Sequence, residues 1–450
     1  MTGVQTVLFR SQQLSTLFLA HSYPRSNYLH FQRTLKDQLL LKGGTLHTIS
    51  GEILEGHDLL FANGKIVTID EQIQPSPETD VYDIYGKHVV PGYIAGYTRI
   101  GLTEIGLVKQ TNDHSEIGEI NPNVRANVSY NPDSDLVPVT RSNGVLIVNS
   151  APSSGRISGQ SSVMMLDGWT WEDATLKHPT ALNLNWPNMH VNLRKDAKKK
   201  EKDQRDAYNK AIREIDRLVR DVRAYHQRRT VRERKAEQKQ QSDLRLESMV
   251  PFIIHKEPIH VHANDIRQIE AAVKWANKHG FNIVIVGGWD AWRNPELLVK
   301  HNIPVILLSV QTTPRRRYEP IHTPYKVPAM LHEAGVRFCL STDPGYPFDG
   351  HVRTLPNEAM RAAAWGLPKS EAMRAITLSA AEILGIEEQV GSLEPGKDAT
   401  FFIADAHPLI QTTNPTKAFI QGREVDLSDR QKNLWEKYKE KYRRLGRLNE

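Results

Sequence analysis

The sequence predicts an α/β protein, a parallel β/α barrel with a smaller β-domain assembled from both ends of the chain. In the middle of the chain, short apolar runs alternate with segments of helical periodicity, which is typical of parallel strands separated by helices. Near both ends, pairs of apolar runs are separated by turn residues, which indicates antiparallel hairpins.

The clearest strand-helix-strand unit runs from Pro258 to Val286. Its first strand is the apolar run 258–263 and its second is 281–286. Because the run Ile283 to Val286 has no polar alternation, we expect it to be buried on both faces of a parallel sheet. The helix between the strands is predicted from apolar residues spaced three and four apart: Ile266, Ile269, Ala272, Val273 and Ala276.

The amino-terminal half is predicted to contain mainly strands. Residues 38–70 form a hairpin around Asn63-Gly64, a strong two-residue turn signal, and a further strand covers 87–94. The apolar runs 144–149 and 181–185 are also predicted strands.

Two loops and a long charged helix complete this half. We expect a long ordered loop at 102–143 and a Gly-rich loop of small residues at 150–162. Residues 195–239 are predicted to be helical, with one docked face and solvated charges elsewhere. The docked face is predicted from an apolar repeat: Ala207, Ala211, Ile215, Leu218, Val222 and Tyr225.

In the carboxy-terminal half, apolar strands at 304–309 and 336–342 flank a predicted helix at 327–334. A further helix is predicted at 371–384. Strands follow at 390–403 and at 417–425, the latter with a turn at Gln421-Gly422. A basic helix from Ser428 to Leu445 closes the chain.

Composition restricts the partners. The chain has 450 residues, a net charge of +6 and a pI near 9.1, but its basic residues gather in two helical stretches instead of alternating with aromatic residues. We therefore expect no nucleic-acid partner. No run of about 18 apolar residues occurs, so no membrane span is predicted.

The single cysteine, Cys339, lies inside an apolar run and is expected to be buried. A disulfide framework and a thiolate metal site are then excluded, and any metal must be held by His, Asp or Glu. Residues 2–11 resemble translated sequencing adapter, and no export signal is recognisable after them. The compartment therefore stays open between cytoplasm and periplasm.

Two histidines and one aspartate are the candidate site residues. His260 and His262 are two apart on a strand and therefore share a face, with His262 nearer the carboxyl end, where ligands bind in such sheets. The pair fits either metal ligands or two hydrogen-bonded interior histidines. Asp343 directly follows the strand at 336–342.

Together these segments resemble the amidohydrolase superfamily, and within it the group related to imidazolonepropionase. The motifs are GKHVVPGYIAGYTRIGL for the first barrel strand, PIHVHA for the fifth, FCLSTDPG for the eighth, and GSLEPGKDATFFI with AFIQGREV for the closing β-domain. The resemblance implies a (β/α)8 TIM-type barrel with a composite β-sandwich.

The implied domain boundaries follow from these motifs. The barrel covers 91–390 and carries a charged helical insertion at 195–240, and the β-sandwich combines 38–90 with 391–427. An unassigned segment, 1–37, precedes these domains. A basic helix, 428–450, follows them.

The resemblance also implies a hydrolase of carbon–nitrogen bonds in non-peptide amides, cyclic amides or small peptides, using water activated by a divalent metal, with zinc as the expected ion. The family's fifth-strand histidine ligand falls on His262. Its eighth-strand aspartate, a ligand and general base, falls on Asp343.

Other family positions carry different residues. The first-strand His-x-His pair falls on Tyr97 and Arg99, the sixth-strand histidine falls on or beside Gly287 and Gly288, and no bridging lysine is found. Fewer matched ligands remain than the three that catalytic zinc usually takes from a protein.

Two interpretations address the missing ligands. In the first, His260, His262 and Asp343 hold a metal with the help of a loop histidine. The loop candidates are His114, His322 and His351. In the second, Arg99 replaces the metal and pairs with Asp343, so that the protein is a pseudoenzyme or binding module that holds a carboxylate ligand.

The expected partner in both interpretations is a small molecule, and a homo-oligomer stays open. Four residues are predicted to contact this small molecule: Tyr97, Arg99, Trp289 and Asp290. Trp292 is expected to pack on the barrel.

Overall fold

The computed structural model describes residues 38–194, 198–234, 242–344 and 349–448. The chain divides into two units, Met1–Thr34 and Leu35–Glu450, and the second contains every described residue. The adapter-like segment 2–11, the unassigned segment 1–37 and the ends of the predicted helix 195–239 lie outside the described residues.

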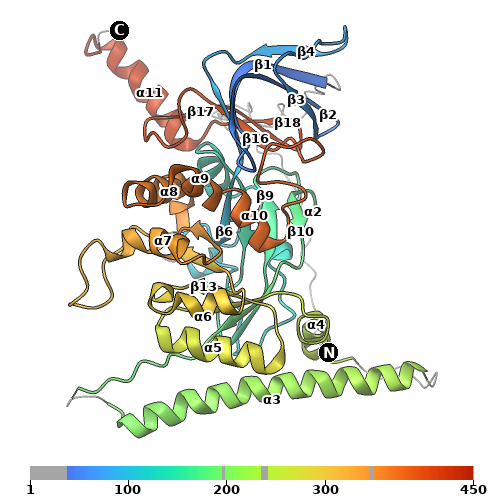
Figure 1. Ribbon diagram of the computed structural model, residues 1–450, viewed down its shortest axis with the longest axis vertical. Helices are drawn as coiled ribbons and strands as arrows, with labels where there is room; N and C mark the ends of the chain where they lie inside the picture. Colours follow the sequence, from blue (N-terminus) through green and yellow to red (C-terminus); the bar gives the residue numbers. More distant parts are fainter. Residues whose placement is uncertain (1–37, 195–197, 235–241, 345–348, 449–450) are drawn as a thin grey trace, which may run out of the picture. The chain divides into compact units, whose positions relative to one another are not determined.

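Strands from both ends of the chain form one sheet of eight strands among the described residues (Figure 1). Its order is β18-β17-β16-β5-β1-β2-β3, and β4 pairs with β1. The strands are β1 (Gln38–His47), β2 (Ile53–Ala62), β3 (Lys65–Asp70), β4 (Asp80–Asp83), β5 (His88–Pro91), β16 (Phe401–Ala404), β17 (Pro415–Ile420) and β18 (Arg423–Val425).

Both predicted two-residue turns are confirmed in this sheet. Asn63 and Gly64 have φ of 50° and 79° and join β2 to β3, while Gln421 and Gly422 have φ of 48° and 75° and join β17 to β18. Positive φ at both central residues matches the right-handed twist of the strands.

Aromatic rings from both ends of the chain pack together inside this sheet. The ring of Phe61 contacts those of Phe401 and Phe419 edge to face, with centroids 5.4 and 5.1 Å apart. All three side chains are buried. Because these rings are far apart in sequence, their burial ties the two ends of the chain together.

The central strands, β6 to β15, form two further sheets with orders β10-β9-β7-β6 and β15-β14-β13-β12-β11-β8. Neighbours from β11 to β15 are parallel, as are β6 and β7. The strands are β6 (Tyr93–Thr98), β7 (Val145–Ser150), β8 (Ile157–Gln160), β9 (Ser162–Met165), β10 (Thr175–Lys177), β11 (Leu182–Asn185), β12 (Ile259–Ala263), β13 (Ile283–Gly287), β14 (Val305–Leu308) and β15 (Phe338–Ser341).

Two contacts connect these sheets. Only Ser161 separates β8 from β9, and Ser341 at the end of β15 hydrogen-bonds to the backbone of Tyr97 in β6. The described strands do not form a continuously paired ring, because β15 and β6 meet through a side chain.

Two strands depart from the predicted parallel arrangement. β9 is antiparallel to β7, and β8 is antiparallel to β11. The prediction of a loop over 150–162 was therefore wrong in its second half. Its small residues are fully buried strand residues, and side-chain size does not reveal such a strand.

Helices follow most of the central strands (Figure 1). The structure corrects two predictions here: the predicted loop 102–143 contains α1, and the predicted helix 371–384 is divided into α9 and α10. The helices are α1 (Leu136–Arg141), α2 (Trp171–Ala174), α3 (Glu201–Arg234), α4 (Leu244–Ile253), α5 (Ile266–His279), α6 (Pro295–Lys300), α7 (Thr323–Glu333), α8 (Leu355–Ala364), α9 (Lys369–Ala375), α10 (Leu378–Leu384) and α11 (Arg430–Arg444).

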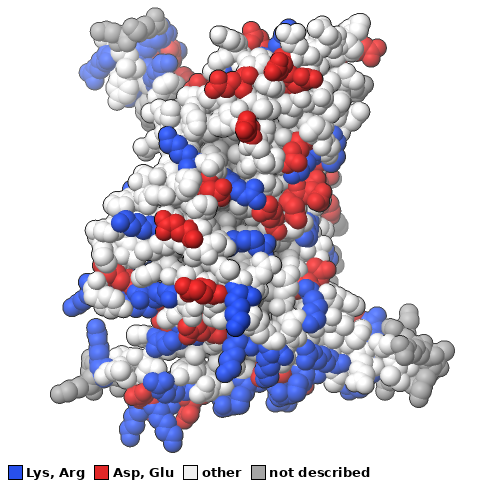
Figure 2. All heavy atoms as spheres, viewed as in Figure 1, with Lys and Arg blue, Asp and Glu red and all other residues white. Residues whose placement is uncertain are grey.

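The charged helix α3 lies along α5, and its docked face is close to the predicted one (Figure 1). Val219 is buried, whereas Ala207 is exposed. Asp216 accepts hydrogen bonds from Trp275 Nε1 (3.1 Å) and from Lys278 Nζ (2.8 Å) of α5. Figure 2 shows Lys and Arg side chains gathered along α3, which agrees with the predicted solvated faces.

No helix in the described ranges combines the length and the apolar character that are needed to cross a membrane. Cys339 is buried and carries a free thiol, as the sequence predicted.

The aromatic contacts of the eight-stranded sheet give a stability prediction. Replacing Phe401 by alanine should lower the free energy of unfolding by about 3–5 kcal/mol, because the cavity lies among buried rings. Urea unfolding followed by circular dichroism measures this change. The control is Tyr85→Ala, whose side chain is 85% exposed and should change stability by less than about 0.5 kcal/mol. Equal losses in the two variants would contradict the packing argument.

Candidate functional site

The carboxyl ends of β6 and β15 are held side by side. Ser341 Oγ accepts a hydrogen bond from Tyr97 N at 3.1 Å and donates one to Tyr97 O at 2.8 Å. Asp343 follows two residues later, and its charge acts on the Tyr97 phenol. The first-strand and eighth-strand positions predicted from the sequence therefore share one neighbourhood.

Tyr97 is buried, and its hydroxyl group is protonated at neutral pH. Burial raises the pKa of Tyr97 to about 12, with the charge of Arg99 lowering it and that of Asp343 raising it. The phenol is therefore available as a neutral hydrogen-bond donor.

His262 projects from β12 toward Tyr97. The two ring centroids are 4.8 Å apart in a T-shaped arrangement. His262 Nε2 lies 3.2 Å from Asn183 Oδ1 on the neighbouring strand β11. Because an amide oxygen only accepts, Nε2 carries the ring proton.

Burial and the charge of Arg99 lower the pKa of His262 to about 4, so its imidazole is neutral at pH 7. The same Arg99 charge acts on Tyr97. A cationic side chain thus stands beside both rings, at the position where the family pattern has a histidine ligand.

His260 lies deeper and is fully buried. Neither of its ring nitrogens has a hydrogen-bond partner among the described residues. Burial, followed by the charges of His262 and Lys177, lowers its pKa to about 3. Its imidazole is therefore neutral in the folded protein.

The position of the missing sixth-strand histidine is filled by another side chain. Gly287 ends β13 with φ of 100°, and a Cβ atom added there would overlap the side-chain amide of Asn264. Any side chain at this position requires Asn264 to move.

These residues do not fit a metal centre with three protein ligands. Within the described ranges, no three His, Cys, Asp or Glu side chains are grouped so as to hold an ion, so His260, His262 and Asp343 do not come together as one ligand set. The Nε2 proton of His262 is donated to Asn183, which removes that lone pair from coordination.

The loop histidines proposed as extra ligands also form no such group with them. His322 precedes α7, and its ring stacks on Trp365 with centroids 5.4 Å apart.

Asp290 is buried after β13 and is bound by arginines. It accepts hydrogen bonds from Arg316 Nη1 at 2.7 Å, from Arg293 Nε at 3.2 Å and from Ile266 N at 3.1 Å. Burial alone raises the pKa of Asp290, but these bonds and the arginine charges outweigh it and lower the pKa. Asp290 is therefore an ionised group that holds the surrounding loops.

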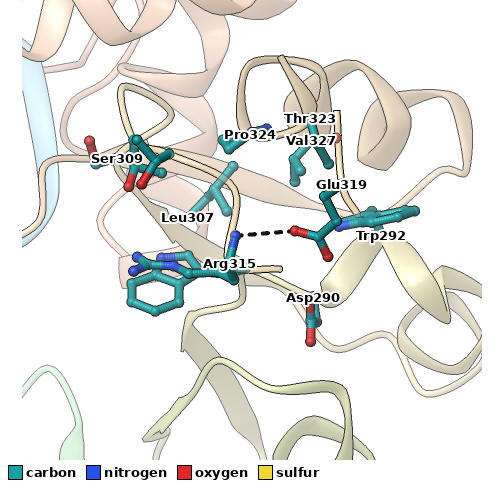
Figure 3. A pocket seen from close by; sticks show the side chains of 12 residues that line it. Asp290, Trp292, Leu307, Ser309, Arg315, Glu319, Thr323, Pro324 and Val327 are labelled. Carbon is teal, nitrogen blue, oxygen red and sulfur yellow. Dashed lines mark hydrogen bonds between the residues drawn. The ribbon is translucent and has the colours of Figure 1, made fainter. Parts of the chain in front are cut away.

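A small cavity, open to solvent, lies beside Asp290 (Figure 3). Trp289, Asp290 and Trp292 line it, together with Arg315 and Glu319 from the loop after β14. Neither Arg315 nor Glu319 was predicted as a site residue from the sequence. The run PRRRYE at 314–319, directly after a predicted strand, was the available signal.

Residues 254–427 match the amidohydrolase family. Among curated proteins, the chain is similar to the amidohydrolase tasK of Hapsidospora irregularis, with 21% identity over 392 residues. The aligned part covers 81% of this chain but only 39% of that protein.

Among solved structures, the chain is similar to an amidohydrolase from Thermotoga maritima, with a TM-score of 0.75 and 25% sequence identity. The match covers 86% of this chain and 99% of that one. A prolidase in complex with N-methylphosphonate-L-proline has a TM-score of 0.52 and 16% identity, covering 86% of this chain and 99% of that chain. The second likeness concerns the fold alone.

The burial of His260 predicts an acid-sensitive fold. Between about pH 6.5 and pH 4, the unfolded chain binds a proton at this histidine and the folded chain does not, so stability falls as pH falls. In His260→Gln, the slope of unfolding free energy against pH should decrease by about 1.4 kcal/mol per pH unit. Urea titrations at several pH values test this. The matched control is the exposed His190→Gln, and an unchanged slope in His260→Gln would contradict the prediction.

Proposed function

We propose that this chain, which contains an amidohydrolase family domain at residues 254–427, hydrolyses carbon–nitrogen bonds of small amides or peptides. We further propose that the chain is a member of the group related to imidazolonepropionase. The proposed domains are a (β/α)8-type scaffold at 91–390 with an insertion at 195–240 and a composite domain built from 38–90 and 391–427. A terminal helix is proposed at 428–450. The observation that carries it is the convergence of Tyr97, Arg99 and Asp343 where β6 and β15 end.

Asp343 is the proposed general base. Its carboxylate takes a proton from water while the water oxygen bonds to the carbonyl carbon of the substrate. The electron pair of the C=O bond moves onto the oxygen. Arg99 and the neutral hydroxyl group of Tyr97 stabilise that negative charge by hydrogen bonding.

The tetrahedral intermediate then breaks its carbon–nitrogen bond. Asp343 returns its proton to the leaving nitrogen, so the products are a carboxylic acid and an amine, and the base is regenerated. His262 does not take part in proton transfer in this scheme, because it is neutral and donates its Nε2 proton to Asn183.

Water activation by a divalent metal was the expectation from the family pattern. We derive no step through a metal, because the residues around His262 do not fit the ligand set. Arg99 supplies a permanent positive charge in this neighbourhood and takes over the polarising role in the proposal.

The second candidate function is a binding module of the same fold, in which Arg99 and Asp343 pair and Arg99 holds a carboxylate ligand. The neutral states of Tyr97 and His262 favour it, because neither ring places a negative charge beside the guanidinium. The two candidates differ in whether Asp343 is needed for turnover.

Replacing Asp343 by asparagine separates these candidates. For a hydrolase, kcat in a screen of amides and dipeptides should fall about 100-fold or more, because the base is lost, while unfolding free energy changes little. The control is Asp203→Asn, an exposed carboxylate in the first turn of α3. No turnover by the parent protein, with a stability loss of about 3–5 kcal/mol in Asp343→Asn, would instead support the structural pair.

Metal removal tests the ligand argument. Elemental mass spectrometry of the purified protein should find well below one equivalent of zinc or manganese, and dialysis against a chelator should leave activity unchanged. His262→Ala should not change the metal content. Near one equivalent of metal in the parent, lost in His262→Ala, would overturn the metal-free mechanism.

A further inference from the structure

The cavity beside Trp289 and Arg315 has an apolar wall. Leu307 from β14, Val327 and Pro324 from α7, and Trp292 all line it (Figure 3). Apolar side chains in a concave site favour a ligand with an aliphatic or aromatic body, because binding removes apolar surface from water.

The two neighbouring arginines in the loop after β14 have different surroundings. Arg316 is bound by Asp290 at 2.7 Å and by Glu319 at 2.9 Å. The guanidinium of Arg315 makes no hydrogen bond or ion pair to any residue of the described ranges. It lies over the ring of Trp289, 3.0 Å from the centroid.

The backbone fixes Arg315 in this place. Glu319 accepts hydrogen bonds from Arg315 N at 3.1 Å and Arg316 N at 3.2 Å (Figure 3). The Glu319 carboxylate is also bound by Arg293 at 2.5 Å. Because the acids at the cavity are occupied by Arg293 and Arg316, the donors of Arg315 are left for a ligand.

We propose that this cavity binds small carboxylates with an apolar body, with Arg315 holding the carboxylate. A guanidinium presents paired N–H donors that match the two oxygens of a carboxylate. Trp289 covers one face of the guanidinium, so that an ion pair at the other face is less hydrated.

The charge of Asp343 acts on Arg315, which places the cavity close to the proposed base. The carboxylate subsite would then select substrates for the hydrolase. This role in selection rests on the proposed function, but the binding step does not.

The probes are 4-methylpentanoate and its uncharged counterpart 4-methylpentanamide, titrated by calorimetry into full-length protein. The parent protein should bind the acid at least about 10-fold more tightly than the amide. Arg315→Met should weaken binding of the acid by about 10- to 100-fold, the range expected for a charge-assisted hydrogen-bonded pair, and should change amide binding little.

Arg317→Met is the matched control, because Arg317 is an exposed arginine of the same run that does not line the cavity. It should bind the acid as the parent does. Circular dichroism establishes that both variants fold.

Equal affinity for acid and amide, no binding at millimolar concentration, or equal losses in Arg315→Met and Arg317→Met would overturn the proposal. Repeating the titration on Asp343→Asn separates it from the proposed function. Retained binding there supports the subsite even if no hydrolysis is ever detected. Loss of acid binding in Asp343→Asn would show that the carboxylate binds elsewhere and would contradict the proposed subsite.

Discussion

The hydrogen bonds of Ser341 to both backbone groups of Tyr97 join the ends of β6 and β15, and the candidate site depends on this contact. The two strands are separated by more than half of the chain and are not joined by a backbone ladder in the described residues. A buried hydroxyl that both accepts and donates costs little in desolvation, because its hydrogen-bonding capacity is used. As a result, Tyr97, Arg99 and Asp343 lie in one neighbourhood, in which the charges of Arg99 and Asp343 both act on the Tyr97 phenol.

The residues at the positions of the expected metal ligands have defined neighbours. Asn183 accepts the Nε2 proton of His262, and Asn264 occupies the space in front of Gly287. Burial and the charge of Arg99 keep His262 neutral, whereas burial keeps Tyr97 protonated against the charge of Arg99.

In the loop after β14, the ion pairs of Arg316 leave the neighbouring Arg315 at the cavity. Asp290 and Glu319 each bind two arginines, and the network ties the ends of β13 and β14 together. Charged groups with little exposure need this degree of pairing. Once Arg316 is committed to the network, the adjacent Arg315 points to the cavity and onto Trp289. The rigid pairs therefore position Arg315 at the cavity.

The sequence by itself determined the features that depend on neighbouring residues. The turns at Asn63-Gly64 and Gln421-Gly422, the helix at 266–279, and the docked face of α3 all follow from local backbone preferences or from a repeat in one segment. Only the tertiary structure decided the antiparallel direction of β8 and β9 and the hydrogen bond between His262 and Asn183. It also decided that Arg316 joins the ion-pair network while Arg315 lies at the cavity. Those outcomes depend on which distant groups meet, because burial, hydrogen bonding and charge are properties of the assembled neighbourhood.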